Sequence, residues 1–207
     1  MPETPLPATR WAAAGGGADS GYATRFAQLV ADGDDVYGEG RLADVLVGRG
    51  ARILDVGSGM GRIAAYLRGC GHDVVAAEPD PALVEQSQAT YPELEVLPHQ
   101  ILELTPELVG APVDLVVCVG NVMPYVAAGT EVACLARLRS LLAPAGRILV
   151  GFHLRQGPST ARVYTPEEFV EEVETAGLAV QHRFGGYALE PANDEYAVWV
   201  LGEQRPG

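Results

Sequence analysis

The stretch Ile53-Leu54-Asp55-Val56-Gly57-Ser58-Gly59-Met60-Gly61-Arg62 decides the fold. A short apolar strand is predicted over 52–56, and a helix is predicted to begin at Arg62, with the glycines in the turn between them. Glycine permits a tight turn and lets a ligand approach the backbone closely. The first turn of the following helix presents free N–H groups and the positive end of the helix dipole. This strand, glycine loop and helix therefore predict a ligand-binding turn.

Strands and helices alternate regularly after this turn. The apolar pattern predicts further strands over 72–77, 95–98, 113–119, 146–153, 178–184 and 195–201, and helices over 62–70, 81–90, 131–142 and 165–176. Such alternation indicates βαβ units and a parallel sheet with helices on both faces. The continuous apolar run Leu115–Val119 is typical of a strand that is covered on both faces. The last two strands are joined by a loop, which favours an antiparallel pair.

The predicted fold class is therefore α/β: a Rossmann-like, doubly wound, mostly parallel sheet of seven strands, with an antiparallel C-terminal hairpin and helices on both faces. Residues 21–207 are predicted to form a single domain, whose segment at about 21–48 is helical. Residues 1–20 are rich in Pro, Ala and Gly, and are predicted to form a mobile tail.

The charge of the chain excludes several classes of partner. The 207 residues carry 27 acidic and 14 basic side chains, for a formal net charge of −13. Binding to nucleic acid or to an anionic membrane surface depends on clustered cations, so neither partner is expected. All the basic residues are arginines, which excludes Schiff-base chemistry, pyridoxal phosphate anchoring and a P-loop lysine.

Cysteine usage and the N-terminus indicate a cytoplasmic protein. The three cysteines form no C-x-x-C pair and have no histidine at metal-ligand spacing, so neither a disulfide framework nor a metal site is expected. The first residues have no basic start and no apolar run, so no signal peptide is expected.

An acidic residue, Glu78, directly follows the second predicted strand. Glu78 lies 21 residues after Gly57. A carboxylate about 20 residues beyond such a loop can accept hydrogen bonds from both ribose hydroxyls of a nucleoside. The alternative is that Glu78 is an ordinary acidic residue of a surface loop.

Two features argue against a dinucleotide. The glycines are spaced Gly57-x-Gly59-x-Gly61, and Arg62 stands where the third glycine of a G-x-G-x-x-G fingerprint would fall. Asp55, two residues before the first glycine, would repel a pyrophosphate but suits an ammonium group.

The stretch Leu54–Arg62 resembles the nucleotide loop of class I S-adenosylmethionine-dependent methyltransferases, above all the small bacterial ones without a characterised substrate. The resemblance covers about residues 50–182 and includes Glu78-Pro79-Asp80, Val113–Asn121, Leu141–Val150 and Glu174–Leu178. It implies S-adenosylmethionine as cofactor, S-adenosylhomocysteine as product, and in-line methyl transfer to a small-molecule acceptor.

The resemblance also implies roles for individual residues. Glu78 would hold the ribose, Asp55 would lie near the methionine amino group, and Arg62 would either pair with the methionine carboxylate or remain an ordinary surface arginine. Many relatives carry an aspartate after the third strand, where this chain has His99-Gln100, so the carbonyl of Gln100 would have to replace it. The remaining implied cofactor contacts are Gly57, Ser58, Gly59, Gly61, Pro79, Ile101, Val119, Gly120 and Asn121.

No catalytic motif is visible on the acceptor side. Methyl transfer depends mainly on positioning and desolvation, and needs a general base only for a protonated acceptor. His153 could be that base, or could make only a local hydrogen bond. Tyr22 and Arg25 could close as a lid over the methionine tail, or belong to an ordinary amphipathic helix. The acceptor-side candidates are Tyr22, Asn121, Met123, Tyr125, His153 and Tyr164.

Two other functions remain open from the sequence. The first is a non-catalytic protein that binds S-adenosylmethionine or S-adenosylhomocysteine, which the departure at His99-Gln100 permits. The second is an NAD(P)-dependent oxidoreductase, against which Arg62 and the lack of a Tyr-x-x-x-Lys pair both argue. A nucleic-acid substrate is not expected, and the chain is expected to be a monomer or a homodimer.

Overall fold

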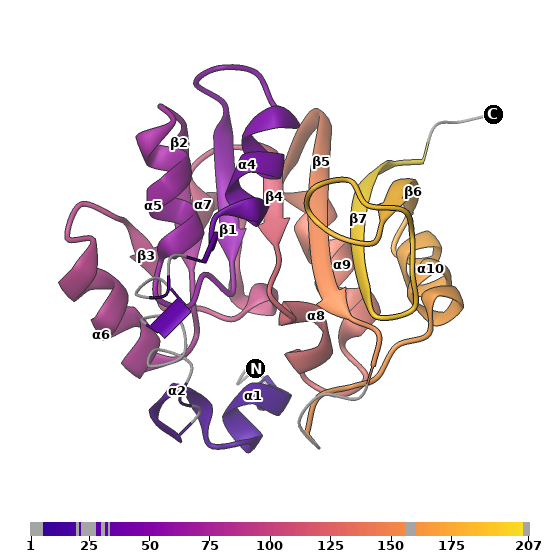
Figure 1. Cartoon of the computed structure of the whole chain (residues 1–207), viewed down its shortest axis with the longest axis horizontal. Coiled ribbons are helices and arrows are strands. Elements are labelled where there is room, and N and C mark those ends of the chain that lie inside the picture. The colour runs from indigo at the N-terminus through magenta and orange to yellow at the C-terminus, as the bar shows by residue number, and fades with distance from the viewer. Residues whose placement is uncertain are drawn as a thin grey trace, which may run out of the picture.

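A computed structural model describes residues 6–19, 21, 28–29, 32, 34–155 and 160–204. Seven strands form one sheet in the order β3-β2-β1-β4-β5-β7-β6 (Figure 1). Neighbouring strands from β3 to β5 are parallel, and β7 runs antiparallel to both β5 and β6. The predicted fold class is confirmed. The strands are β1 Arg52–Val56, β2 Asp73–Ala77, β3 Val96–Leu97, β4 Val113–Cys118, β5 Leu142–His153, β6 Leu178–Phe184 and β7 Tyr196–Glu203.

The longer described helices either precede β1, as α4 does, or connect successive strands. They are α4 Gly38–Val45, α5 Arg62–Gly69, α6 Pro81–Thr90, α9 Glu131–Ser140 and α10 Pro166–Thr175. The short helices are α1 Arg10–Ala13, α2 Gly16–Asp19, η1 Ile101–Glu103, α7 Pro106–Val109 and α8 Val122–Tyr125. The short helices were not predicted individually, because a single turn has no measurable apolar period. No helix in the described part of the chain is long and apolar enough to cross a membrane.

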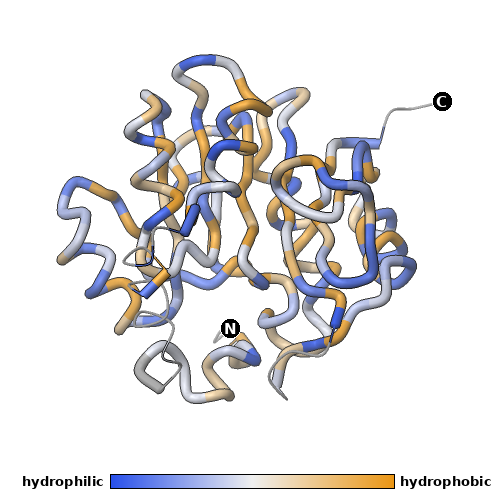
Figure 2. The backbone as a smooth tube through the Cα atoms, viewed as in Figure 1, coloured by the Kyte–Doolittle hydropathy of each residue, from blue (hydrophilic) through white to orange (hydrophobic). Residues whose placement is uncertain are grey.

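The sheet has a hydrophobic core on each face. Ile53 and Leu54 are adjacent in β1 and both fully buried, since successive side chains of a strand point to opposite faces. Helices α4 and α5 pack on the face of Ile53, and α9 and α10 pack on the face of Leu54 (Figure 1). Figure 2 shows the hydrophobic residues concentrated in the central strands. This double cover explains the continuous apolar runs in the sequence.

The β5 strand differs from its predicted range. It was predicted over 146–153, after a helix reaching 142, but the structure begins it at Leu142. Val113 pairs with Leu142, and the register then shifts before Leu115 pairs with Arg147. The irregular part of β5, between Leu142 and Arg147, includes Ala145 at a φ of 64°. It is assigned to the strand although its sequence indicates a turn.

The N-terminal segment also differs from its prediction. The mobile tail was predicted over 1–20, but within 6–19 the structure places two short helices that contact the rest of the chain. Arg10 donates to the Val126 carbonyl oxygen at 2.8 Å, and the Trp11 indole N–H donates to Asp80 at 2.7 Å. These long-range bonds give the segment a fixed place that its composition does not indicate. The helical segment predicted at about 21–48 contains α4, and much of 21–33 lies outside the described residues.

Candidate functional site

A cavity of about 850 Å³ opens at the carboxyl edge of the parallel strands. Each of these strands delivers a lining residue at or just beyond its end: Gly57 after β1, Glu78 after β2, Gln100 after β3, Asn121 after β4 and His153 in β5. Open α/β sheets bind ligands at this edge, because the loops after neighbouring strands converge there.

The glycine loop between β1 and α5 forms the floor of the site. Gly57, Gly59 and Gly61 have φ values of 63°, 56° and 80°, a left-handed conformation that glycine adopts without strain. A side chain at Gly57 would also collide with Val122, and one at Gly61 would collide with Ser87. Because these glycines have no side chain, the loop backbone packs directly against Val122 and Ser87 and leaves room for a ligand to approach it closely.

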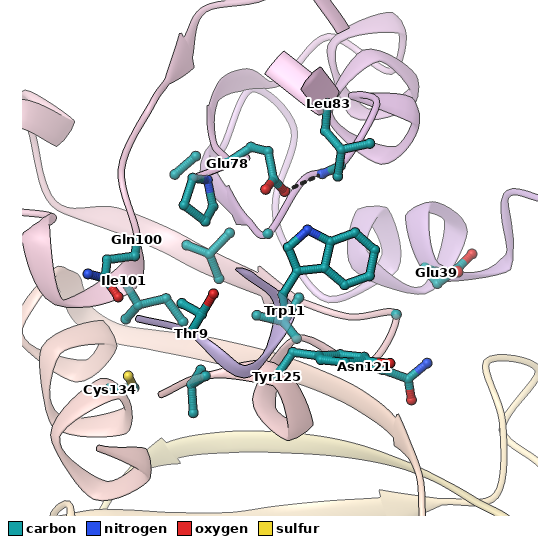
Figure 3. A pocket seen from close by; sticks show the side chains of 18 of the residues that line it. Thr9, Trp11, Glu39, Glu78, Leu83, Gln100, Ile101, Asn121, Tyr125 and Cys134 are labelled. Carbon is teal, nitrogen blue, oxygen red and sulfur yellow. Dashed lines mark hydrogen bonds between the residues drawn. The ribbon is translucent and has the colours of Figure 1, made fainter. Parts of the chain in front are cut away.

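Glu78 points into the cavity with its carboxylate already oriented (Figure 3). One oxygen accepts a hydrogen bond from the Gly59 N–H at 2.9 Å, and the other accepts one from the Asp80 N–H at 2.9 Å. Burial raises the pKa of Glu78 above its usual value, although both backbone donors oppose the shift. Each carboxylate oxygen has a further lone pair. Glu78 can therefore accept two more hydrogen bonds from a ligand.

A smaller pocket next to the loop contains two buried polar atoms without a partner. Oδ2 of Asp55 and Oγ of Ser58 have no hydrogen-bond partner among the described residues. Burial raises the pKa of Asp55 to about 7, opposed by the nearby charge of Arg62. Val119 and Gly120 complete the wall. A ligand with an ammonium group would satisfy both oxygens, since a buried polar group without a partner is costly.

Arg62 lies at the same pocket but is already paired. Its guanidinium contacts both carboxylate oxygens of Glu39 in α4, at 3.2 and 3.0 Å. The two side chains are 14% and 17% exposed. Arg62 is therefore largely buried in an ion pair, and pairing with a ligand carboxylate would have to share or replace Glu39. Sequence reasoning missed Glu39, because its neighbour across the pocket is 23 residues away.

The other end of the cavity is mostly apolar. Pro79, Leu83 and Ile101 are among its lining residues. Gln100 lies next to Ile101 (Figure 3). The backbone N–H of Gln100 donates to Glu103 at 2.8 Å, which fixes the start of η1. Pro79, Gln100 and Ile101, which the resemblance assigns to an adenine site, thus line the same cavity.

The N-terminal segment reaches into the middle of the cavity. The Trp11 ring lies between Glu78 and Tyr125 (Figure 3). Its centroid is 5.4 Å from that of Tyr125 in an edge-to-face arrangement. The Asp80 carboxylate accepts a hydrogen bond from the indole N–H at 2.7 Å and one from the Gly17 N–H at 2.5 Å. The Ala82 N–H donates a third. Burial alone would raise the pKa of Asp80, but these hydrogen bonds lower it below its usual value. The sequence did not predict Trp11 at this site, because it lies in a Pro-, Ala- and Gly-rich stretch.

The predicted acceptor-side residues divide into three groups. Tyr125, Asn121 and His153 line the cavity, and the Asn121 side-chain oxygen accepts from the His153 backbone N–H at 2.8 Å. Met123 and Tyr164 were expected on the acceptor side, but neither lines the cavity. Met123 is fully buried in the core, and Tyr164 is buried against Phe152 and Phe169. Tyr22 and Arg25, the predicted lid residues, lie outside the described residues.

Two tyrosines from the C-terminal hairpin line the cavity and were not predicted. Tyr187 lies in the loop after β6, and Tyr196 begins β7. Their hydroxyls are 2.8 Å apart, and the ring of Tyr196 packs edge to face on His153 at 4.8 Å. The pairing of Tyr196 with His153 in the sheet depends on the order of β5 and β7, which the sequence does not reveal.

Comparison with known proteins identifies the family. A family profile described as a methyltransferase domain matches residues 53–146. The crystal structure of a TehB-like SAM-dependent methyltransferase from Corynebacterium glutamicum is 33% identical in sequence, covers 88% of this chain and 96% of that chain, and has a TM-score of 0.78. This chain belongs to the S-adenosylmethionine-dependent methyltransferases.

More distant methyltransferase structures share the fold. The 1,6-didemethyltoxoflavin-N1-methyltransferase of Burkholderia thailandensis is 24% identical, with coverage of 98% of this chain and 93% of that chain and a TM-score of 0.64. The CcbJ methyltransferase of Streptomyces caelestis is 16% identical, with coverage of 81% and 90% and a TM-score of 0.72. No curated protein matched the chain.

Proposed function

We propose that this methyltransferase transfers the methyl group of S-adenosylmethionine to a small molecule bound at the Asn121, Tyr125 and His153 side of the cavity. One observation carries the proposal. The main cavity holds a pre-oriented carboxylate and a wall of aromatic side chains, and the smaller pocket with the buried carboxyl of Asp55 shares Glu39, Gly57, Arg62 and Gly120 with it. Trp11 reaches into this cavity between Glu78 and Tyr125 and reduces the room for an acceptor, which favours a small molecule over a macromolecule.

The residues present fit the cofactor at both of its polar ends. Glu78 has free lone pairs for the ribose hydroxyls, and its orientation is fixed by two backbone N–H groups. Asp55 and Ser58 offer oxygens without partners to the amino group of the methionine part. Pro79 and Ile101 offer an apolar surface for the adenine. This fit supports the cofactor assignment of each of these residues.

The chain contributes mainly position and desolvation to the reaction. When bound, S-adenosylmethionine supplies a methyl group on a positively charged sulfur, which is a good leaving group. The glycine loop and Glu78 fix the cofactor, while Trp11 and Tyr125 exclude water from the cavity. A protonated acceptor atom must lose its proton as it gains the methyl group. We assign the imidazole nitrogen of His153 to receive that proton, because this side chain faces the cavity at the end of β5.

The charge of the chain also supports a small acceptor. The net charge of −13 opposes a nucleic-acid substrate, whose binding requires clustered cations. The Burkholderia thailandensis relative was crystallised with 1,6-didemethyltoxoflavin, a small molecule. At 24% identity, that likeness shows the fold alone.

Calorimetric titration with S-adenosylhomocysteine tests the cofactor site. We expect the wild-type protein to bind S-adenosylhomocysteine and not NAD. Replacing Glu78 with alanine removes the charged partner of the ribose, which should weaken binding by about 1–3 kcal/mol. The matched control is Glu85→Ala, which removes the same group from an exposed position of α6. Equal affinity of Glu78→Ala and the control would disprove the ribose assignment, and binding of NAD alone would disprove the cofactor assignment.

A further inference from the structure

The hydroxyl pair of Tyr187 and Tyr196 has no part in cofactor binding as described above. The two oxygens are 2.8 Å apart at the wall of the cavity. Tyr196 pairs in the sheet with His153 at the end of β5, and thus lies on the acceptor side. The pair therefore needs an explanation of its own.

The surrounding backbone is built to admit this pair. A side chain at Gly151 in β5 would collide with the Tyr187 hydroxyl and come within 3.1 Å of the Tyr196 hydroxyl. The Gly151 carbonyl oxygen accepts from the Asn121 backbone N–H at 3.1 Å. The two hydroxyls therefore lie beside the turn that follows β4, next to the predicted acceptor-side residues.

A proton count shows what the pair can offer. Each phenol has one proton to donate, and one of the two is used between the hydroxyls. The Gly120 N–H, which also approaches both oxygens, can only donate. Burial raises the pKa of both tyrosines well above the usual value, so both remain protonated at neutral pH. The second proton is then available to a ligand oxygen or nitrogen in the cavity.

The charges lining the cavity disfavour an anionic acceptor. Among the described lining residues, the carboxylates of Glu39 and Glu78 face one guanidinium, that of Arg62. Both carboxylate oxygens of Glu39 contact that guanidinium. The acceptor side offers instead the aromatic rings of Tyr125 and His153. The excess of carboxylates and the aromatic rings on the acceptor side together favour a ligand with an uncharged ring.

We propose that the Tyr187–Tyr196 hydroxyl pair recognises an uncharged aromatic acceptor through an oxygen or nitrogen at the edge of its ring. The proposal rests on the proposed function, and it names the class of acceptor for the same cavity. Tyr187 and Tyr196 are specificity-determining residues: they hold the acceptor and take no part in the transfer itself.

Three matched probes test the proposal by fluorescence titration at neutral pH, with the protein saturated with S-adenosylhomocysteine. 2-Naphthol has a hydroxyl on a neutral bicyclic ring, naphthalene lacks it, and 2-naphthoate carries a negative charge. We expect 2-naphthol to bind about fivefold to tenfold more tightly than naphthalene, the effect of one neutral hydrogen bond. We expect 2-naphthoate to bind less tightly than 2-naphthol.

Tyr187→Phe and Tyr196→Phe remove one hydroxyl each. Because either single variant leaves one hydroxyl whose proton is free, the double variant Tyr187→Phe/Tyr196→Phe is the decisive one. It should bind 2-naphthol no better than naphthalene, with unchanged affinity for naphthalene and S-adenosylhomocysteine. Tyr91→Phe is the control, because Tyr91 is also partly buried but does not line the cavity. Selectivity for 2-naphthol that survives both substitutions would overturn the proposal.

The wild-type comparison is decisive even where a variant does not fold. Equal binding of 2-naphthol and naphthalene, or stronger binding of 2-naphthoate, overturns the proposal without any variant. Failure of the wild-type protein to bind S-adenosylhomocysteine would overturn the cofactor assignment instead. In that case, the same three titrations of the cofactor-free protein still decide the role of the hydroxyl pair.

Discussion

At the scale of single residues, Asp55 is a buried carboxyl whose burial costs free energy. The residue is 2% exposed, and one oxygen of its carboxyl has no partner among the described residues, at the end of an apolar strand. A buried carboxylate loses hydration that only a charged or hydrogen-bonding partner restores. Such an arrangement reduces the stability of the free protein, and a ligand that carries a positive charge would recover the loss.

The cost of Asp55 predicts a specific pH dependence of stability. Burial raises its pKa from 3.8 to about 7, so the folded state holds a proton that the unfolded state releases. The contribution of Asp55 is therefore most favourable below pH 3.8 and is lost as the pH rises towards about 7. The side-chain amide of the variant Asp55→Asn cannot ionise. The unfolding free energy of that variant, relative to wild type, should therefore increase by about 2–3 kcal/mol between about pH 5 and pH 8.

Urea unfolding of both proteins at the two pH values, without cofactor, measures this difference. A gain that is the same at both pH values would contradict the raised pKa. The variant should also bind S-adenosylhomocysteine more weakly, because the amide cannot neutralise an ammonium group. Greater stability with poorer binding would mark Asp55 as a functional residue rather than a structural one.

At the scale of elements, the N-terminal segment depends on tertiary contacts. Helices α1 and α2 have four residues each, too few for a helix to be stable in isolation. The Arg10 guanidinium donates to Val126 and to the buried carboxylate of Glu131, both at 2.8 Å. This anchor holds the neighbouring Trp11 over the cavity.

Arg10→Ala should therefore release the segment without disturbing the sheet. Hydrogen exchange measured by mass spectrometry should show faster exchange over residues 10–19, and unchanged protection in β1, β4 and β5. Glu131 retains Arg162 at 3.3 Å, so its buried charge keeps a partner in the variant. Arg49→Ala is the control, since Arg49 is 84% exposed and only reaches Asp44 at 3.7 Å. Unchanged exchange over residues 10–19 would mean that Arg10 is not the anchor.

Local sequence was sufficient to predict several of the strands and helices. The β1 range Arg52–Val56, the α6 range Pro81–Thr90 and the β6 range Leu178–Phe184 match their predictions. Each is bounded by glycine, proline or a capping residue and has a clear apolar pattern. Asp80, for example, caps α6 through the Ala82 N–H at 3.0 Å, just before a proline at the first helical position.

Contacts between distant segments could not be predicted in this way. The glycine loop and Glu78 were found because they follow strands at a regular spacing, and the structure places them together. Trp11, Glu39 and Tyr187 reach the cavity from a tail, a helix and a hairpin loop, whose positions depend on tertiary packing. A Pro-, Ala- and Gly-rich stretch gives no signal that one of its residues docks 69 positions away, as Trp11 does on Asp80.

At the scale of the whole molecule, strand order assembles the site. β1 and β4 are neighbours although residues 57–112 separate them in sequence, and the cavity opens where the chain leaves both. Placing β7 between β5 and β6 brings Tyr196 beside His153. The proposed cofactor residues thus follow β1 to β4, and the proposed acceptor residues follow β4 or lie in β5 and the C-terminal hairpin. Different acceptors can be accommodated by changes in the second half that leave the first intact.

The net charge of −13 predicts how the whole molecule responds to salt. Like charges repel one another more in the compact state than in the unfolded chain, so screening them should stabilise the fold. Exposed ion pairs such as Arg155–Glu195 would be weakened by the same salt, but each contributes little. We therefore expect Tm, measured by calorimetry, to rise by about 2 °C or more as NaCl increases from about 0.02 M to 0.2 M. Sodium sulfate acts partly by exclusion from the surface, so NaCl is the appropriate salt. A fall in Tm over this range would mean that attractive ion pairs outweigh the excess of acidic residues.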